Sequence, residues 1–180
     1  MFDSTTSLLD ADQEPLTDES LIAGWAEDTA FNVNEDGDSN AVSYPENTPI
    51  PLVASDTRTV GFGAPIAQDD TNFTRGNEEF VLNVLDAEVG SGTVLFDEGH
   101  SQFYDTGKFD AFIDYAESNG HAIEATTTLG ADLDGAQGAI ITSPSEAFPE
   151  SELNALTTFV SEGGSLLLFT NPTSVTSTRR

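Results

Sequence analysis

A short acidic cluster that contains a histidine follows an apolar run near the middle of the chain. In the stretch GTVLFDEGHSQFYD, residues 92–105, the apolar residues end at Asp97, Glu98 and His100. A neutral histidine beside two carboxylates has the groups needed to relay a proton or to bind a divalent cation. The i, i+1, i+3 spacing matches no established ligand pattern, so a specific metal site is less expected here than a catalytic role.

The same residues also suit a turn that leads from a strand to a helix. In that interpretation Asp97 caps the turn, Gly99 supplies an unusual backbone angle, and the His100 ring packs against Phe103 or Tyr104. We favour this structural or ligand-contacting role over a catalytic one, and keep the cluster as the catalytic candidate.

Alternating strand and helix patterns in the second half place this cluster in a fold. Apolar runs predict strands at 93–97, 121–127, 138–144 and 165–170, and apolar residues at helical spacing predict helices between them. Runs that are apolar throughout are typical of parallel strands covered on both faces. The sequence therefore predicts an α/β fold, with a flavodoxin- or Rossmann-like doubly wound parallel sheet over about residues 91–180.

The first half, residues 1–90, predicts a β-rich α+β segment that forms a separate domain. The run at 21–25 suits either a helix or a strand, and its glycine favours the strand. The runs at 50–54 and 59–63 predict a hairpin. Residues 77–90 predict a helix with Asn77 as its N-cap. Gly90–Gly92 is the best boundary between the two domains.

The carboxyl ends of parallel strands share one edge of a sheet, where open α/β proteins bind their ligands. We expect residues 97–100, 126–128, 143–145 and 170–171 to meet at that edge. The ligand-binding candidates are therefore Asp97, His100, Ser143, Ser145 and Asn171.

A polar turn in the first half resembles part of a calcium loop. Asn32, Asn34, Asp36 and Gly37 match positions 1, 3, 5 and 6 of an EF-hand loop, but Ser43 stands where a bidentate glutamate belongs. Chance clusters of this kind are common in turns of an acidic chain. We therefore expect no cofactor and keep only weak metal-ligand candidates: Asn32, Asn34, Asp36 and Asp38.

The charge balance is the strongest compositional feature. Thirty-two acidic residues face five basic ones, for a net charge of −27, while 37% of the residues are hydrophobic. The hydrophobic content argues against a disordered acidic tail, and the self-repulsion predicts a halophilic, archaeal protein that requires high salt. Because clusters of lysine and arginine are absent, we expect no nucleic-acid partner and no binding to anionic membranes, and the partner is an unknown protein or small ligand.

The absence of cysteine excludes disulfides, zinc thiolate sites, iron–sulfur clusters and a cysteine nucleophile. No run approaches the ~20 apolar residues of a membrane span. The first residues lack the basic and apolar regions of a signal peptide. These features predict a soluble chain, cytoplasmic by default, or extracellular if the sequence is an excerpt from a longer exported protein.

Four stretches carry a family resemblance over roughly residues 58–170: GFGAPIAQDDTNFTRGNEEFVLNVLD, GTVLFDEGHSQFYD, DLDGAQGAIITSPSEAF and LNALTTFVSEGGSLLLF. They resemble domains with a class I glutamine amidotransferase-like fold, related to the GIFT-type domains of gliding-motility transporter accessory proteins and of an intraflagellar transport subunit. Relatives usually continue with more sheet after the fourth strand, which leaves a truncated domain as an open alternative.

The resemblance implies a flavodoxin-like sheet that serves binding or scaffolding, since the nucleophilic cysteine of true amidotransferases is missing. We therefore expect a non-catalytic binding or scaffolding module. The alternative is a hydrolase, divalent-metal-dependent in one form, that uses Asp97, Glu98 and His100.

Overall fold

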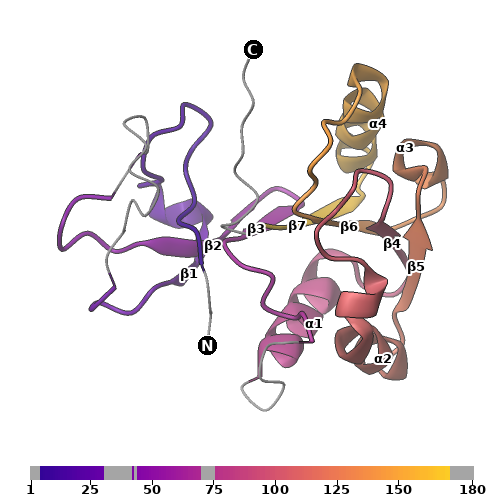
Figure 1. Ribbon diagram of the computed structural model, residues 1–180, viewed down its shortest axis with the longest axis horizontal. Helices are drawn as coiled ribbons and strands as arrows, with labels where there is room; N and C mark the ends of the chain where they lie inside the picture. The colour runs from indigo at the N-terminus through magenta and orange to yellow at the C-terminus, as the bar shows by residue number, and fades with distance from the viewer. Residues whose placement is uncertain (1–4, 31–41, 43, 70–75, 171–180) are drawn as a thin grey trace.

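A computed structural model describes residues 5–30, 42, 44–69 and 76–170, and it has a mixed α/β fold built on one seven-stranded sheet (Figure 1). The strands are β1 (Ile22–Trp25), β2 (Pro51–Asp56), β3 (Thr59–Phe62), β4 (Thr93–Asp97), β5 (Ala122–Thr126), β6 (Gly138–Thr142) and β7 (Ser165–Phe169). The helices are η1 (Glu19–Leu21), α1 (Asn77–Glu88), η3 (Thr106–Lys108), α2 (Asp110–Ser118), α3 (Leu129–Asp132) and α4 (Glu150–Ser161).

The sheet is mostly parallel, with strand order β1-β2-β3-β7-β6-β4-β5. The four strands predicted in the second half pair in parallel, which confirms that part of the α/β prediction. The predicted hairpin, β2 with β3, and the strand β1 are also confirmed, and both of their pairings are antiparallel. The finer likeness to flavodoxin or Rossmann folds stays a prediction.

One sheet crosses the boundary that the sequence suggested at residue 90. Strand β3 pairs in parallel with β7, with Thr59 opposite Leu166 and Phe62 opposite Phe169. The hairpin therefore adds β3 as a fifth parallel strand and β2 as one that runs in the opposite direction, and β1, antiparallel to β2, completes the sheet.

Helices cover both faces of the parallel strands, with α1 and α2 on one side and α3 and α4 on the other (Figure 1). Because successive strand residues point to opposite faces, Leu167 packs into the core beneath α1 and α2, while Leu166 packs beneath α3 and α4. This two-sided burial explains why β4, β6 and β7 read as near-continuous apolar runs, whereas the edge strand β5 contains Glu124.

The start of α1 differs from the prediction. Asn77 is the first helical residue rather than the N-cap, and Gly76 takes the N-cap position with a φ of 78°. A left-handed backbone at that point favours glycine, which has no Cβ to clash. The prediction placed the N-cap one residue too late, because a side-chain cap was expected at Asn77. The chain instead enters α1 through the left-handed backbone of Gly76, and no side chain in the described part of the chain caps the helix.

An aromatic contact joins the hairpin to the rest of the sheet. The rings of Phe62 and Phe169 stack with centroids 4.4 Å apart and planes inclined by 7°, and both side chains are buried. Phe109, from the start of α2, meets Phe169 edge-on at 5.7 Å. The two segments on either side of residue 90 therefore share one aromatic core.

We expect Phe169→Ala to destabilise the protein by about 3–5 kcal/mol, the range for truncating a buried phenylalanine. A double-mutant cycle with Phe62→Ala should give a coupling of about 0.5–1.5 kcal/mol, because the two rings stack. Denaturant unfolding monitored by circular dichroism checks both values, with half-exposed Leu153→Ala as a control that should change stability by less than about 0.5 kcal/mol. Two separate unfolding transitions would contradict a shared core.

Candidate functional site

The loops after β4 and β6 meet at a topological switch point. From β4 the chain passes through α2 to β5, and then returns across β4 to β6, α4 and β7. Since α2 and α4 cover opposite faces, the two adjacent strands β4 and β6 send their chains in opposite directions. In open α/β sheets, a crevice for ligands forms outside the strand ends at such a point.

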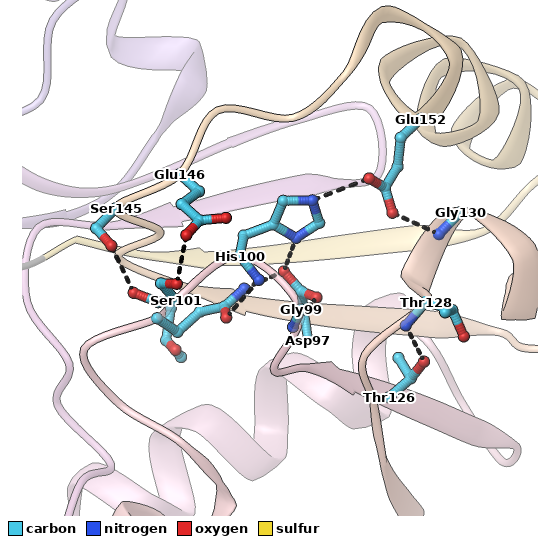
Figure 2. A network of polar contacts seen from close by, with 12 residues as sticks. Asp97, Gly99, His100, Ser101, Thr126, Thr128, Gly130, Ser145, Glu146 and Glu152 are labelled. Carbon is cyan, nitrogen blue, oxygen red and sulfur yellow. Dashed lines mark hydrogen bonds and ion pairs between the residues drawn. The ribbon is translucent and has the colours of Figure 1, made fainter.

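His100 lies at this point between two carboxylates (Figure 2). Its Nδ1 is 2.9 Å from Asp97 Oδ2, and its Nε2 is 2.9 Å from Glu152 Oε2. Asp97 is fully buried, and the His100 and Glu152 side chains are 9% and 13% exposed. Both ring nitrogens donate to carboxylates only when the imidazole is protonated, so this geometry holds an imidazolium between two anions.

The carboxylates control the charge of the ring. Burial alone lowers the pKa of His100, because it penalises the charged form, but hydrogen bonds and charge attraction from Asp97 and then Glu152 outweigh burial and raise that pKa above 6.5. A ring whose two nitrogens are both occupied has no free lone pair with which to accept a proton from a substrate. Through its hydrogen bonds to Asp97 and Glu152, His100 therefore cross-links the end of β4 to α4.

The turn that follows β4 is organised around Asp97. Its Oδ1 accepts a hydrogen bond from Gly99 N at 3.0 Å, which confirms the predicted cap, and the Gln102 side-chain amide donates to Oδ2. Gln102 Oε1 in turn accepts from His100 N at 3.0 Å. Asp97 is thus held by backbone, amide and imidazole donors together.

Gly99 is required for space. An added Cβ would lie 2.5 Å from the carbonyl oxygen of Thr127, whereas the positive φ in this turn belongs to Ser101, at 49°. Glycine was predicted here for a special backbone angle, but the structure gives a different reason. The backbone of the loop after β5 lies too close to Gly99 to leave room for a side chain. A non-glycine residue in the left-handed region costs about 1 kcal/mol or more, so surrounding contacts must hold Ser101 there.

The predicted packing of the His100 ring was also wrong. The ring stacks on Phe148, with centroids 3.7 Å apart and planes inclined by 24°. Phe103 and Tyr104 contact each other instead, at 4.9 Å, and Phe103 is 63% exposed. The reason is that the loop after β6 brings Phe148 against the imidazole, while Tyr104 packs against the core and Phe103 contacts Tyr104.

Hydrogen bonds connect the two loops. The His100 carbonyl accepts from Ser145 N and Glu146 N, each at 3.1 Å. Ser145 Oγ donates to the Ser101 carbonyl at 2.8 Å, and Ser101 Oγ donates to Glu146 Oε1 at 2.9 Å (Figure 2). The structure therefore brings Ser145 beside His100, as expected, through main-chain contacts.

Ser143 and Glu98 lie at the same edge but serve other contacts. Ser143, with a φ of 42°, donates from Oγ to the Phe169 carbonyl at 3.2 Å and so ties β6 to β7. Glu98 Oε1 accepts from Thr106 N at 2.9 Å and from Thr106 Oγ1 at 2.7 Å, which fixes the start of η3. Glu98 is thus engaged away from the His100 ring.

Several candidates fall outside the described residues. These are the ligand candidate Asn171 and the weak metal-ligand candidates Asn32, Asn34, Asp36 and Asp38. Within residues 5–30, 42, 44–69 and 76–170, no three His, Cys, Asp or Glu side chains are grouped so that they could hold a metal ion.

Glu152 is the functional residue that sequence reasoning missed. It comes from the first turn of α4, 52 residues after His100, and its other oxygen, Oε1, accepts from Gly130 N at 2.8 Å. Gly130 leaves room for this contact, since a Cβ there would lie 2.8 Å from Glu152 Cγ. The usable signal was an acidic residue in the first turn of a helix that starts at the same sheet edge.

Comparisons with known proteins give no family assignment. No family model, no curated protein and no solved structure matches this chain. In the described part of the chain, every helix is too short or too polar to cross a membrane.

We expect His100→Gln to destabilise the protein most at low pH. Because the folded-state pKa of His100 is raised above 6.5, its contribution is fully present below about pH 6.5 and is lost as pH rises through the folded-state pKa. Removing one partner of a buried ion pair costs about 3–5 kcal/mol, so the difference in unfolding free energy between wild type and variant should approach that value near pH 5.5 and shrink toward pH 9.

Chemical denaturation from about pH 5.5 to pH 9 measures this difference, in which the general repulsion of the acidic surface cancels. Glu152→Gln is the matched variant, since it keeps a hydrogen-bonding side chain but removes one anion, and it should move the loss of stability to lower pH. A difference between wild type and His100→Gln that stays constant over this range would contradict the ionised cross-link.

Proposed function

We propose that this protein is a non-catalytic α/β module that serves binding or scaffolding. The observation that carries the proposal is the occupancy of His100, whose two ring nitrogens are each 2.9 Å from a carboxylate oxygen. Glu98 accepts hydrogen bonds from Thr106. The three ionisable side chains of the turn at residues 97–100 therefore all have structural partners. General-base catalysis needs a ring nitrogen that can accept a proton from the substrate. Because both nitrogens of His100 are hydrogen-bonded to carboxylates, the ring stabilises the fold instead.

The same contacts make the carboxyl edge of the sheet a rigid platform. His100 and Glu152 connect the loop after β4 to α4, and Glu152 also reaches the start of α3 through Gly130. Rigid presentation suits a binding surface, because little conformational entropy is lost when a partner binds. The resemblance to amidotransferase-like domains that lack the cysteine nucleophile fits this role.

The competing proposal is a hydrolase that uses Asp97, Glu98 and His100. The 2.9 Å contact between Asp97 and His100 Nδ1 favours it, because a carboxylate that orients an imidazole is the arrangement used by general bases. For that chemistry, Glu152 would have to release Nε2 when a substrate binds.

An activity panel separates the two proposals. In about 2 M KCl, where the surface charge is screened, we expect no turnover of ester, phosphoester or glycoside substrates above the blank. Turnover that is lost in both His100→Gln and Asp97→Asn, while Glu98→Gln and wild type stay active and all variants give a folded circular dichroism spectrum, would overturn the binding proposal. Activity lost with Glu98→Gln as well would assign the full cluster to catalysis.

A halophilic source is part of the proposal, and the scarcity of cations that could pair with the acids supports it. The described cations, Arg58 and Lys108, form no ion pair with a carboxylate, and every salt bridge in the described part of the chain involves a histidine. Arg58 instead donates to the Glu88 carbonyl at 2.9 Å at the end of α1. The acidic surface therefore has almost no internal counter-charge.

We expect the folded state to require salt. The Debye length, over which charges act on one another, is ~3 Å in 1 M salt and ~10 Å at 0.1 M. Repulsion among the acids therefore becomes long-ranged in dilute buffer. The circular dichroism signal should collapse below about 0.5 M KCl, and a variant with ten exposed acids changed to their amides should fold at lower salt. An unchanged spectrum in dilute buffer would remove the halophilic interpretation.

A further inference from the structure

The free edge of the sheet at β5 has the features of a strand-binding site. Strand β5 is last in the strand order and pairs only with β4 among the described strands. Ala122, Glu124 and Ala125 are exposed along it. An uncovered edge strand offers unpaired backbone groups to another chain. Proteins commonly block such edges with charged side chains, proline or a bulge, and β5 contains neither proline nor a bulge and has Glu124 as its one charged residue.

The pairing with β4 shows which backbone groups are free. Ala122 N donates to the Gly92 carbonyl, and Glu98 N donates to the Thr126 carbonyl. In a parallel ladder alternate residues turn their N–H and C=O groups to the same side, so Ala122, Glu124 and Thr126 face β4. The N–H and C=O groups of Ile123 and Ala125 consequently point outward from the sheet.

A groove runs beside this edge on the α2 side. It has a volume of about 330 Å³, and its lining residues are Thr106, Gly107, Asp110, Ile113, Ile123 and Ala125. Ile113, Ile123 and Ala125 make its floor apolar, with Thr106 and Asp110 as the polar lining. A space of this size beside a strand edge accommodates aliphatic side chains from an added strand, which project on the same face as Ile123 and Ala125.

Acidic residues flank the edge on both faces. On the groove side, Asp110, Asp114 and Glu117 are exposed and share one face of α2 at i, i+4 and i+7, where like charges repel. On the other side Glu124 projects from the strand itself, because alternate residues point to opposite faces. Lys108 is the nearest basic residue in the sequence, and these acids outnumber it. The edge is therefore negatively charged, and a partner that complements it is positively charged.

From these features we infer that the β5 edge binds an extended basic segment of a partner protein by strand addition. The partner's main chain pairs with Ile123 and Ala125, and its aliphatic side chains enter the groove. Its lysine or arginine side chains alternate with the aliphatic ones and therefore meet Glu124 on the opposite face. This inference rests on the proposed binding role and names the partner's chemistry. It does not involve the His100 cross-link.

A fluorescent peptide of about eight residues with alternating valine and lysine is the probe, a length that matches a typical strand. Binding is followed by fluorescence anisotropy in about 2 M KCl, the salt that keeps the protein folded, and again at the lowest salt at which it stays folded, where charge attraction is stronger. We expect saturable binding of this peptide and weaker binding of the peptide that carries glutamate in place of lysine. Absence of saturation up to about 1 mM lysine peptide would overturn the inference.

Ala125→Pro tests the backbone contact. Proline removes an N–H that points away from β4, so the ladder to β4 is kept, as proline tolerance at edge strands predicts. We expect affinity for the lysine peptide to fall at least about tenfold, while Ala125→Ser, which keeps the N–H, binds like wild type. Equal binding by Ala125→Pro and wild type, with both folded by circular dichroism, would overturn strand addition in favour of unspecific charge attraction.

Two further measurements separate geometry from charge. Glu124→Gln should weaken the lysine peptide about fivefold, whereas Asp134→Asn, at an exposed position between α3 and β6, should leave affinity unchanged. Peptides N-methylated on every valine or on every lysine should differ, because only one set of N–H groups can face β5. Equal effects in either comparison would overturn the inference, whereas the proposed function is decided separately by the activity panel.

Discussion

The ion-paired histidine at the switch point is the constraint on which the rest of the carboxyl edge depends. The turn after β4 and the first turn of α4 are joined there by His100, whose two ring nitrogens contact Asp97 and Glu152. The arrangement is self-consistent: two anions this close together in a largely buried place repel, and the cation between them removes the repulsion. Removing the proton would leave one carboxylate facing a ring nitrogen lone pair, so the charge state and the position of α4 are linked.

Much of the fold could be predicted because its signals are local. Unbroken apolar runs identified the parallel strands, and the glycines after α2 and α4, Gly120 and Gly163, have the positive φ values typical of helix ends. The pairing of β3 with β7 could not be predicted in the same way, since it joins segments more than a hundred residues apart. Only the apolar character of Phe62 and Phe169 is visible in the sequence, and many buried residues share that character.

The candidate site was predicted in part for a related reason. Asp97 and His100 belong to one turn, and their contact follows from local spacing, as does the cap at Gly99 N. Glu152 and Phe148, which complete the environment of the imidazole, arrive from the loop and helix after β6. Their relevance depends on β6 lying next to β4, which is a matter of strand order. Glu98 shows the converse: adjacency in sequence placed it with His100, but its side chain turns to Thr106.

The internal polar contacts and the acidic surface follow different electrostatic rules, and this difference decides where a partner can bind. At the switch point each carboxylate has a near partner, so further charge is not needed there and screening by salt changes little. Along β5 and α2 the carboxylates have no such partner among the described residues, so their repulsion is relieved by ions in solution or by a basic chain. A basic strand can also form hydrogen bonds with the outward N–H and C=O groups of Ile123 and Ala125, which dissolved cations cannot do in the same way. Salt screens the attraction between charges, but it does not screen these main-chain hydrogen bonds to the same extent. Recognition at this edge should therefore be carried mainly by the main chain and the groove, with charge selecting among the extended segments that fit.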